Sequence, residues 1–174
     1  RESGYRNLYG CDFFPPNWND DKLITYIHPN NIGDFKKTFD IVTMINSIEH
    51  LSSFRTEIHK IKNSMSSKTL IIIETPNIDS PDFYIFKKYW GGLHQPRHTF
   101  LWGRESIINH LKILGFHDLF HLGSPQPAHW AISLQNSVAA KFPAVKKLLF
   151  KSGRIRGYFI AVMLFLPFGI LQNL

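Results

Sequence analysis

Ten consecutive residues, 89–98, combine side chains that could exchange a proton with a substrate. They read Tyr-Trp-Gly-Gly-Leu-His-Gln-Pro-Arg-His, a composition that suits a substrate-contacting loop better than a helix or a strand. His94 and His98 could each take a proton from a hydroxyl, and Arg97 could pair with an acidic or phosphorylated group. A structural alternative is equally open, in which Trp90 packs into the core and Arg97 pairs with a nearby carboxylate.

A further acid–base candidate follows a strand-like run. Residues 39–45, Phe-Asp-Ile-Val-Thr-Met-Ile, lead into Asn-Ser-Ile-Glu-His at 46–50. An imidazole with an unperturbed pKa near ~6.5 can act as a general base at neutral pH, which makes His50 a third candidate after His98 and His94. Alternatively, Glu49 and His50 begin the following helix and orient its first turn.

Two segments that follow short strands could bind a nucleotide-like ligand. In an open α/β sheet, ligands lie beyond the carboxyl ends of the strands, and an acid there can accept hydrogen bonds from a ribose diol. Asp12 has this position after the run 6–11. Asn30 and Asn31 follow the run 23–27 and could hydrogen-bond an adenine amino group through their side-chain carbonyls. Turn formation is the alternative role of all three residues.

Nine histidines raise the question of a metal site. His94 and His98 have ligand-like spacing only on a helix, and Pro96 lies between them. Cys11 is the only cysteine, so there is neither a cysteine pair for a metal nor an intrachain disulfide, and the His-Glu helix of zinc hydrolases is absent from the sequence. We therefore predict no metal site and an intracellular, cytoplasmic protein.

The net charge of +7 is concentrated in the tail. Residues 1–118 hold 14 Lys and Arg against 13 Asp and Glu, whereas residues 119–174 hold six basic residues and no acid. The main body therefore gives no reason to expect a nucleic-acid partner. The basic stretch precedes an apolar run, 158–171, which is shorter than the ~20 residues of a membrane-spanning helix. Residues 141–171 could instead dock on the inner face of a membrane, or they could pack against the sheet.

The elements that must position these side chains alternate between strands and helices. We expect strands over 6–11, 23–27, 39–45, 69–74 and 118–122, of which 39–45 and 69–74 are apolar on both faces, as in a sheet with helices on either side. An amphipathic helix is predicted over 51–65, capped by Ser52 or Ser53, and another over 105–114 that stops at Gly115. After a loop at 124–127, a helix is expected around 138–149. The pattern predicts an α/β layered domain over 1–123 and a helical region over 124–174.

The order of these motifs resembles the second half of a class I S-adenosylmethionine (SAM)-dependent methyltransferase of the small-molecule type. The resemblance covers residues 4–122 and is most specific at the Tyr-Trp…Pro-Arg-His segment, which is similar to one in a bacterial methyltransferase subfamily. It implies a Rossmann-like sheet of strand order 3-2-1-4-5-7-6, of which this chain supplies strands 2 to 6. The Gly-rich cofactor loop and the seventh strand would lie outside the chain, so we expect a fragment that is inactive by itself.

The resemblance also implies roles for named residues. Those expected to bind the cofactor are Asp12, Asn30, Asn31 and Asn46. Those expected to contact the substrate are Trp90, Arg97 and Asn77. The implied function is methyl transfer from SAM to a small-molecule acceptor, by O- or C-methylation of a sugar, a lipid-linked precursor or a secondary metabolite.

Two other functions compete with methyl transfer. A nucleotide-sugar or NAD-dependent Rossmann oxidoreductase would need a catalytic Tyr-x-x-x-Lys helix, a spacing that occurs in this sequence only at Tyr84 and Lys88. A non-catalytic membrane-surface protein on a degenerate methyltransferase scaffold stays open as the alternative.

Overall fold

The computed structural model describes residues 7–12, 24–94, 96–124, 126–144, 150–151 and 154–155. The chain divides into two compact units, each described by itself below. The first consists of Arg1–Met44 and Ser53–Ile72, and the second of Ile45–Ser52 and Ile73–Leu174.

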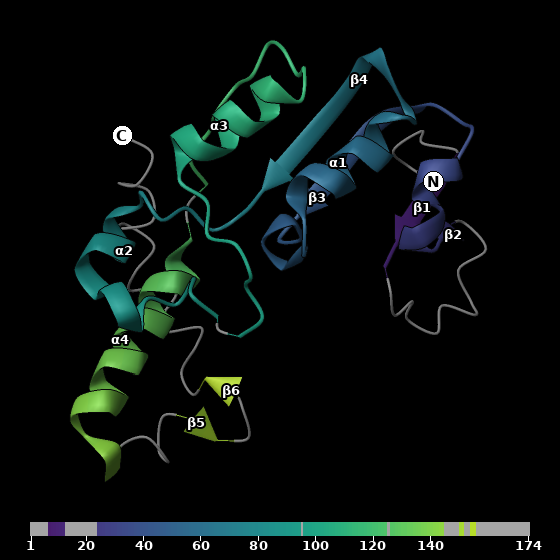
Figure 1. Cartoon of the computed structure of the whole chain (residues 1–174). Coiled ribbons are helices and arrows are strands. Elements are labelled where there is room, and N and C mark those ends of the chain that lie inside the picture. The colour runs from purple at the N-terminus through teal and green to yellow at the C-terminus, as the bar shows by residue number, and fades with distance from the viewer. Residues whose placement is uncertain are drawn as a thin grey trace. The chain divides into compact units, whose positions relative to one another are not determined.

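The first unit opens with two short parallel strands. β1 (Leu8–Cys11) pairs with β2 (Ile24–Ile27) in a register that sets Cys11 opposite Ile27 (Figure 1). A 3-10 helix, η1 (Pro29–Asp34), follows β2 and buries Ile32. These pairings confirm both predicted strands within the residues described.

A strand–helix–strand unit comes next. β3 (Phe39–Ile45) and β4 (Met65–Glu74) are neighbours in one sheet, and α1 (Phe54–Lys62) connects them (Figure 1). Phe39 N donates to Ser64 O at one end, and Asn46 N donates to Glu74 O at the other. The strands therefore run in the same direction, and β4 begins four residues before the predicted Thr69.

The helix α1 contains the middle of the apolar stripe predicted over 51–65, whereas Leu51 precedes the helix and Met65 begins β4. Phe54 and Ile58 are buried, at 3% and 0% exposure, and Ser53 is the N-cap residue. The Ser53 hydroxyl bonds to Thr56 Oγ1 at 2.9 Å instead of to a backbone N–H. Burial of the stripe, rather than a side-chain cap, stabilises this helix.

The prediction that β3 and β4 are buried on both faces is wrong for the described residues. Ile41, Ile45, Leu70 and Ile72 are between 40% and 55% exposed, whereas Met44 is 8% exposed. Residues two apart on a strand share a face, so Leu70 and Ile72 mark one exposed face of β4. Apolar side chains on both faces are typical of a strand that has other elements packed on both sides. The pattern of one strand does not determine whether such an element is present on each side.

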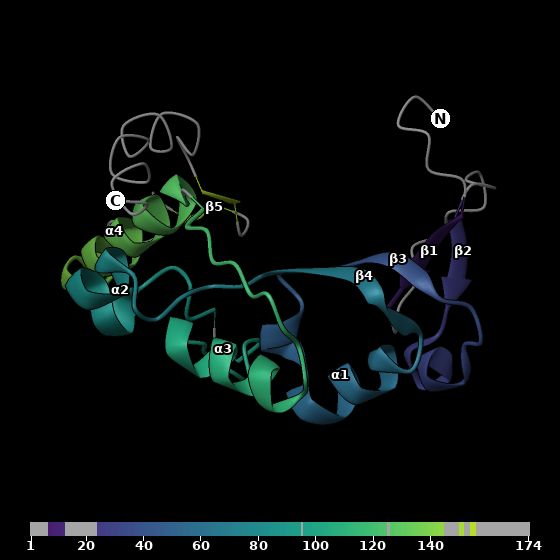
Figure 2. The same cartoon turned by 90° about the horizontal axis from the view of Figure 1, so that it is seen from above.

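The second unit is mainly helical. It contains α2 (Pro81–Phe86), the 3-10 helices η2 (Ile48–His50) and η3 (Lys87–Tyr89), α3 (Arg104–Ile113) and α4 (Pro127–Lys141). The helix α2 lies beside α4 in both views (Figures 1 and 2). The buried apolar residues of the second unit include Ile48, Trp90, Trp102, Leu111, Leu114 and Trp130.

Helix α3 matches its predicted range within one residue at each end. Leu111 and Leu114 are buried, and Gly115 follows with φ 79°. A left-handed residue directly after a helix is the usual position of a terminating glycine, so the predicted stop is confirmed.

The predicted strand over 118–122 is absent from the described structure. Asp118 has φ 52°, which is a turn conformation rather than an extended one. Phe120 and Leu122 are 93% and 89% exposed. Their alternating apolar pattern suggested a strand, but a strand also needs a hydrogen-bonding neighbour, which the pattern cannot specify.

The C-terminal region begins as a helix and differs from the prediction beyond it. The helix α4 starts at Pro127 and ends at Lys141, earlier than the expected range of 138–149. Of the loop expected at 124–127, Ser124 and Gln126 lie outside the helices and strands, whereas Pro127 already belongs to the first turn of α4. A short antiparallel pair, β5 (Phe150–Lys151) and β6 (Arg154–Ile155), lies where only helix was expected. Residues 145–149 and 156–174, with the apolar run, lie outside the described residues. Within the part that is described, every helix is too short or too polar to cross a bilayer.

Candidate functional site

Three histidines of the second unit lie side by side. The ring of His98 is 4.9 Å from that of His50 and 5.4 Å from that of His94, centre to centre. They are the three residues that the sequence analysis named as candidate bases. The structure therefore brings together the loop 89–98 and the segment after β3, which are nearly fifty residues apart.

Backbone carbonyls fix the orientation of two of these rings. His50 Nδ1 lies 2.9 Å from Arg97 O, and His98 Nδ1 lies 2.8 Å from Gly92 O. A carbonyl oxygen only accepts, so each Nδ1 carries the hydrogen. In the neutral imidazoles Nε2 therefore bears the lone pair that can accept a proton or bind a cation.

Both Nε2 atoms face one buried carboxylate. Glu49 is 1% exposed, and its Oε1 is 4.0 Å from Nε2 of His50 and 4.0 Å from Nε2 of His98. Thr75 Oγ1 donates to Glu49 Oε2 at 3.0 Å. Oε1 is buried without a hydrogen-bond partner in the described structure, so one oxygen is held in place and the other is aimed at the imidazoles.

The third imidazole is biased towards its neutral form. Partial burial lowers the pKa of His94, and the neighbouring His98, Arg97 and His50 lower it further through their positive charges. His94 also has a left-handed backbone, with φ 40°. A neutral imidazole near the other two can accept a proton at neutral pH.

Buried contacts hold the beginning of the 89–98 loop against α2 and α4. Trp90 is 2% exposed and its Nε1 donates to Asp82 Oδ2 at 2.7 Å. Gly91 N donates to Ser133 Oγ at 2.8 Å. A Cβ on Gly91 would lie 2.8 Å from the backbone oxygen of His129, so only glycine fits this approach.

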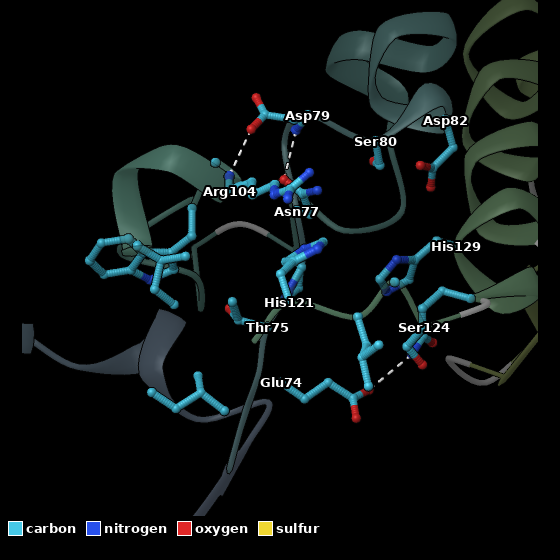
Figure 3. Close-up of a pocket in the computed structure, with 18 of the residues that line it drawn as sticks. Glu74, Thr75, Asn77, Asp79, Ser80, Asp82, Arg104, His121, Ser124 and His129 are labelled. Carbon is cyan, nitrogen blue, oxygen red and sulfur yellow. Dashed lines mark hydrogen bonds between the residues drawn. The ribbon is translucent and has the colours of Figure 1, made fainter. Parts of the chain in front are cut away.

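A pocket of about 230 Å³ opens beside the loop, lined by residues at the end of β4 and at the start of α4 (Figure 3). Its polar walls include Glu74, Asn77, His121 and His129. Gln126 Nε2 donates to Glu74 Oε1 at 3.0 Å. The pocket also includes Thr75, the residue that holds Glu49, so the pocket and the histidine cluster share a wall.

One side of this pocket is formed by an Asx-type turn and by the start of α3, which is capped by a residue distant in the chain. Asp79 N donates to Asn77 Oδ1 at 2.9 Å, and Asp79 Oδ2 accepts from Arg104 N at 2.7 Å (Figure 3). The carboxylate thus satisfies an orphan N–H at the start of α3 and complements the positive end of its dipole. A Cβ on Gly103 would be 2.9 Å from Asp79 Oδ2, so the missing side chain makes room for this cap.

Comparison with known proteins decides the family. A family model described as a methyltransferase domain matches residues 1–119. The chain belongs to this methyltransferase family. The match confirms the resemblance to class I SAM-dependent methyltransferases that the sequence motifs carried. No curated protein and no solved structure gave a significant match.

Of the three residues predicted to contact the substrate, two line the pocket and the third is exposed. Trp90 and Asn77 line the pocket, although the burial of Trp90 also gives it the packing role considered as the alternative. Arg97 has an exposed side chain, and it forms no ion pair with a carboxylate among the described residues. Its carbonyl, rather than its guanidinium, is the group that contacts His50.

The predicted cofactor residues belong to both units. Asn46, in the second unit, lines the pocket and has φ 47°, a conformation that asparagine tolerates better than most residues. In the first unit, Asn30 and Asn31 form the start of η1, where Asn30 N donates to His28 Nδ1 at 3.2 Å and Asn31 N to His28 O at 2.8 Å. Asp12 directly follows β1 and is exposed.

Glu49 is the site residue of this methyltransferase that sequence reasoning left out. The sequence places Glu49 and His50 shortly after β3, but only an imidazole has the unperturbed pKa of a general base at neutral pH. Glu49 belongs to the cluster because a carboxylate at 1% exposure needs partners. Burial itself could not be read from the sequence, because the side chain lies in a short 3-10 helix.

Proposed function

We propose that the protein transfers a methyl group from SAM to a small-molecule acceptor, by O- or C-methylation of a sugar, a lipid-linked compound or a secondary metabolite. Membership of the methyltransferase family supports methyl transfer in general. The observation that carries the finer proposal is the cluster of His50, His94 and His98 around the carboxylate of Glu49. Such a cluster supplies the proton acceptor that a hydroxyl or carbon-acid nucleophile needs.

Strand pairing supports a Rossmann-like methyltransferase sheet. In the order 3-2-1-4-5-7-6, strands 2 and 3 are neighbours, and so are strands 4 and 5. The chain pairs β1 with β2 and β3 with β4, which are those two pairs in chain order. The pairings favour the proposed order over a simple meander, in which β2 and β3 would also be neighbours.

The donors at the carboxyl end of the first sheet fit the adenosine part of SAM. Cys11 lies opposite Ile27, so Asp12 and His28 leave the sheet at the same edge. A carboxylate suits the ribose diol, and the η1 turn with Asn30 offers amide groups for an adenine. When bound, SAM supplies a methyl group on a positively charged sulfur, and the chain has to orient the acceptor and exclude water.

The three histidines have distinct positions for proton removal. His98 is the most enclosed, with a side chain 8% exposed, whereas that of His50 is 41% exposed. An enclosed lone pair on Nε2 is the better-oriented acceptor, which supports His98 as the first candidate in the proposed order His98, His94, His50. The depressed pKa of His94 keeps this residue available as a base at neutral pH.

A binding measurement with a matched acid as control tests the proposal. Asp12→Ala should lower SAM affinity by ~1–3 kcal/mol, the usual cost of leaving a polar partner unpaired. Asp40→Ala, which removes an exposed acid from β3, should leave the affinity unchanged. Calorimetry on the protein that includes the Gly-rich cofactor loop gives both values, because the chain without this loop is expected to be inactive, and release of S-adenosylhomocysteine reports transfer. Absence of SAM binding by the loop-containing protein would favour the non-catalytic scaffold instead.

A further inference from the structure

We propose that Glu49, His50 and His98 bind a divalent transition-metal ion of the Zn²⁺ type. Their donor atoms, one carboxylate oxygen and two imidazole nitrogens, all lie within 4.8 Å of one another. This site goes beyond methyl transfer, because it is defined by the donors alone. Neither its existence nor its test depends on SAM.

The unsatisfied oxygen of Glu49 is the first argument. A carboxylate that is 1% exposed is costly unless it is paired or coordinates a metal. Oε1 is 4.0 Å from both Nε2 atoms, which is too long for a hydrogen bond. The buried oxygen therefore faces two lone pairs across a gap, and a cation in this gap would satisfy all three donors.

The donors need only a small movement to hold an ion. Metal–ligand bonds of ~2.0–2.2 Å place two ligands of a tetrahedral Zn²⁺ ~3.4 Å apart. The two Nε2–Oε1 separations of 4.0 Å would each have to close by about 0.6 Å to reach this distance. Side-chain rotations of the three ligands can supply a movement of this size.

Each ligand is already oriented by a second contact. Arg97 O and Gly92 O accept from Nδ1 of His50 and His98. Thr75 holds Oε2 of Glu49, which leaves Oε1 towards the imidazoles. Metal-binding histidines and carboxylates are commonly held by such outer hydrogen bonds, which fix the tautomer and the ring direction.

The donor set selects the class of ion. Two imidazoles and one carboxylate suit Zn²⁺, Fe²⁺ or Co²⁺, whereas Mg²⁺ and Ca²⁺ prefer oxygen ligands. Three protein ligands also leave coordination positions for water or a substrate oxygen. With the ion bound, the lone pairs of His50 and His98 are engaged, and His94 is the candidate base that remains.

Spacing in the chain cannot reveal this combination. It favours His94 and His98 as a pair of ligands, but Pro96 prevents a helix between them. The structure instead joins His98 with Glu49 and His50, whose separation in the chain gives no recognisable spacing.

Metal titration of the purified, chelator-stripped protein tests the site. Equilibrium dialysis against Zn²⁺ followed by elemental analysis should give one ion per chain, retained in excess Mg²⁺. His50→Ala and His98→Ala should each weaken binding by at least ~10-fold, since loss even of an outer contact costs ~10–100-fold. His59→Ala, an exposed histidine of α1, should bind like the unaltered protein.

Two further readouts keep the test independent of folding and of activity. Co²⁺ in place of Zn²⁺ should give a visible absorption band that both histidine variants lose. The side chain of His50 is 41% exposed, so its replacement leaves the core closed even if Glu49→Gln fails to fold. The proposal would be overturned if the unaltered protein bound clearly less than one Zn²⁺ per chain. It would also be overturned if both histidine variants bound Zn²⁺ with the affinity of the unaltered protein, and the cluster would then take up protons only.

Discussion

Trp90 and Asp82 form a fully buried hydrogen-bonded pair, with Nε1 2.7 Å from Oδ2. Their exposures are 2% and 1%. The indole edge meets Phe83 at a centre-to-centre distance of 5.2 Å and His129 at 5.8 Å. The residue that the sequence suggested as a substrate contact is therefore also the residue that anchors its loop.

Trp90→Phe should lower the free energy of unfolding by ~1–3 kcal/mol, because the buried Asp82 loses a hydrogen-bond donor. Trp90→Ala should cost more, ~3–5 kcal/mol, because it also leaves a cavity. Urea denaturation measures both. Tyr84→Phe, at a side chain 63% exposed, is the control and should change the value by under ~0.5 kcal/mol. An equally small effect of Trp90→Ala would show that the loop is not anchored there.

In the metal-free protein that includes the Gly-rich cofactor loop, where the lone pair of His98 is not engaged by an ion, His98→Ala should lower kcat by ~10²–10⁴ on a hydroxyl acceptor while SAM affinity stays the same. The reason is that this variant removes the most enclosed of the three imidazoles. Steady-state kinetics and calorimetry separate the two effects, with His59→Ala as the control. A large loss in His94→Ala or His50→Ala beside a harmless His98→Ala would reverse the order proposed here.

Gly91→Ala should destabilise the protein by ~1–3 kcal/mol, as overpacking of a tight core does. The new Cβ would lie 2.8 Å from His129 O and 2.9 Å from Ile132 Cβ. Gly33→Ala is a matched control, because its Cβ would meet only Lys60 at 3.7 Å or more. This control should be neutral or slightly stabilising. Equal thermal midpoints of the two variants would contradict the close packing of Gly91 on α4.

The stability of the fold should fall in mild acid because of His129. Burial lowers the pKa of His129, nearby His98 and His94 lower it further, and Asp82 and Glu49 oppose them. The unfolded chain, with a pKa near ~6.5, therefore binds a proton before the folded chain does. The contribution of His129 to the free energy of unfolding is complete above this value. It is lost as the pH falls towards the lower pKa that His129 has in the folded state.

The matching experiment compares free energies of unfolding at pH 7.5 and 5.5. His129→Gln should have a smaller difference between the two values than the unaltered protein, whereas His117→Gln, at an exposed histidine, should not. An unchanged pH dependence in His129→Gln would assign the acid sensitivity to other groups.

The elements that sequence patterns predicted well are those with strong local signals. Helix α3 has apolar residues at helical spacing and Gly115 at its end, and α1 has the same spacing around Phe54 and Ile58. Helix α2 was missed because its six residues are too few to show a period. The strand predicted at Phe120 failed because pairing depends on a distant segment, which an alternating pattern does not reveal.

The candidate site shows the same division. The types of the three histidines marked them as candidates, and the structure places their rings side by side. The carboxylate of Glu49 lies among them because Thr99 N and Oγ1 bond to its backbone oxygen at 2.8 and 3.0 Å. Contacts fifty residues apart in the chain have no counterpart in local periodicity, so the sequence alone could not join these residues.

The two glycines after Trp90 connect the core to the histidine cluster. A Cβ on Gly92 would meet the Trp90 ring at 2.4 Å, so the backbone of Gly92 packs directly against the indole. The carbonyl of the same residue accepts the hydrogen bond from His98 Nδ1. The indole and the imidazole therefore both contact Gly92. A substitution that lets the indole tilt is expected to change the direction of the His98 lone pair at a smaller loss of stability than unfolding requires.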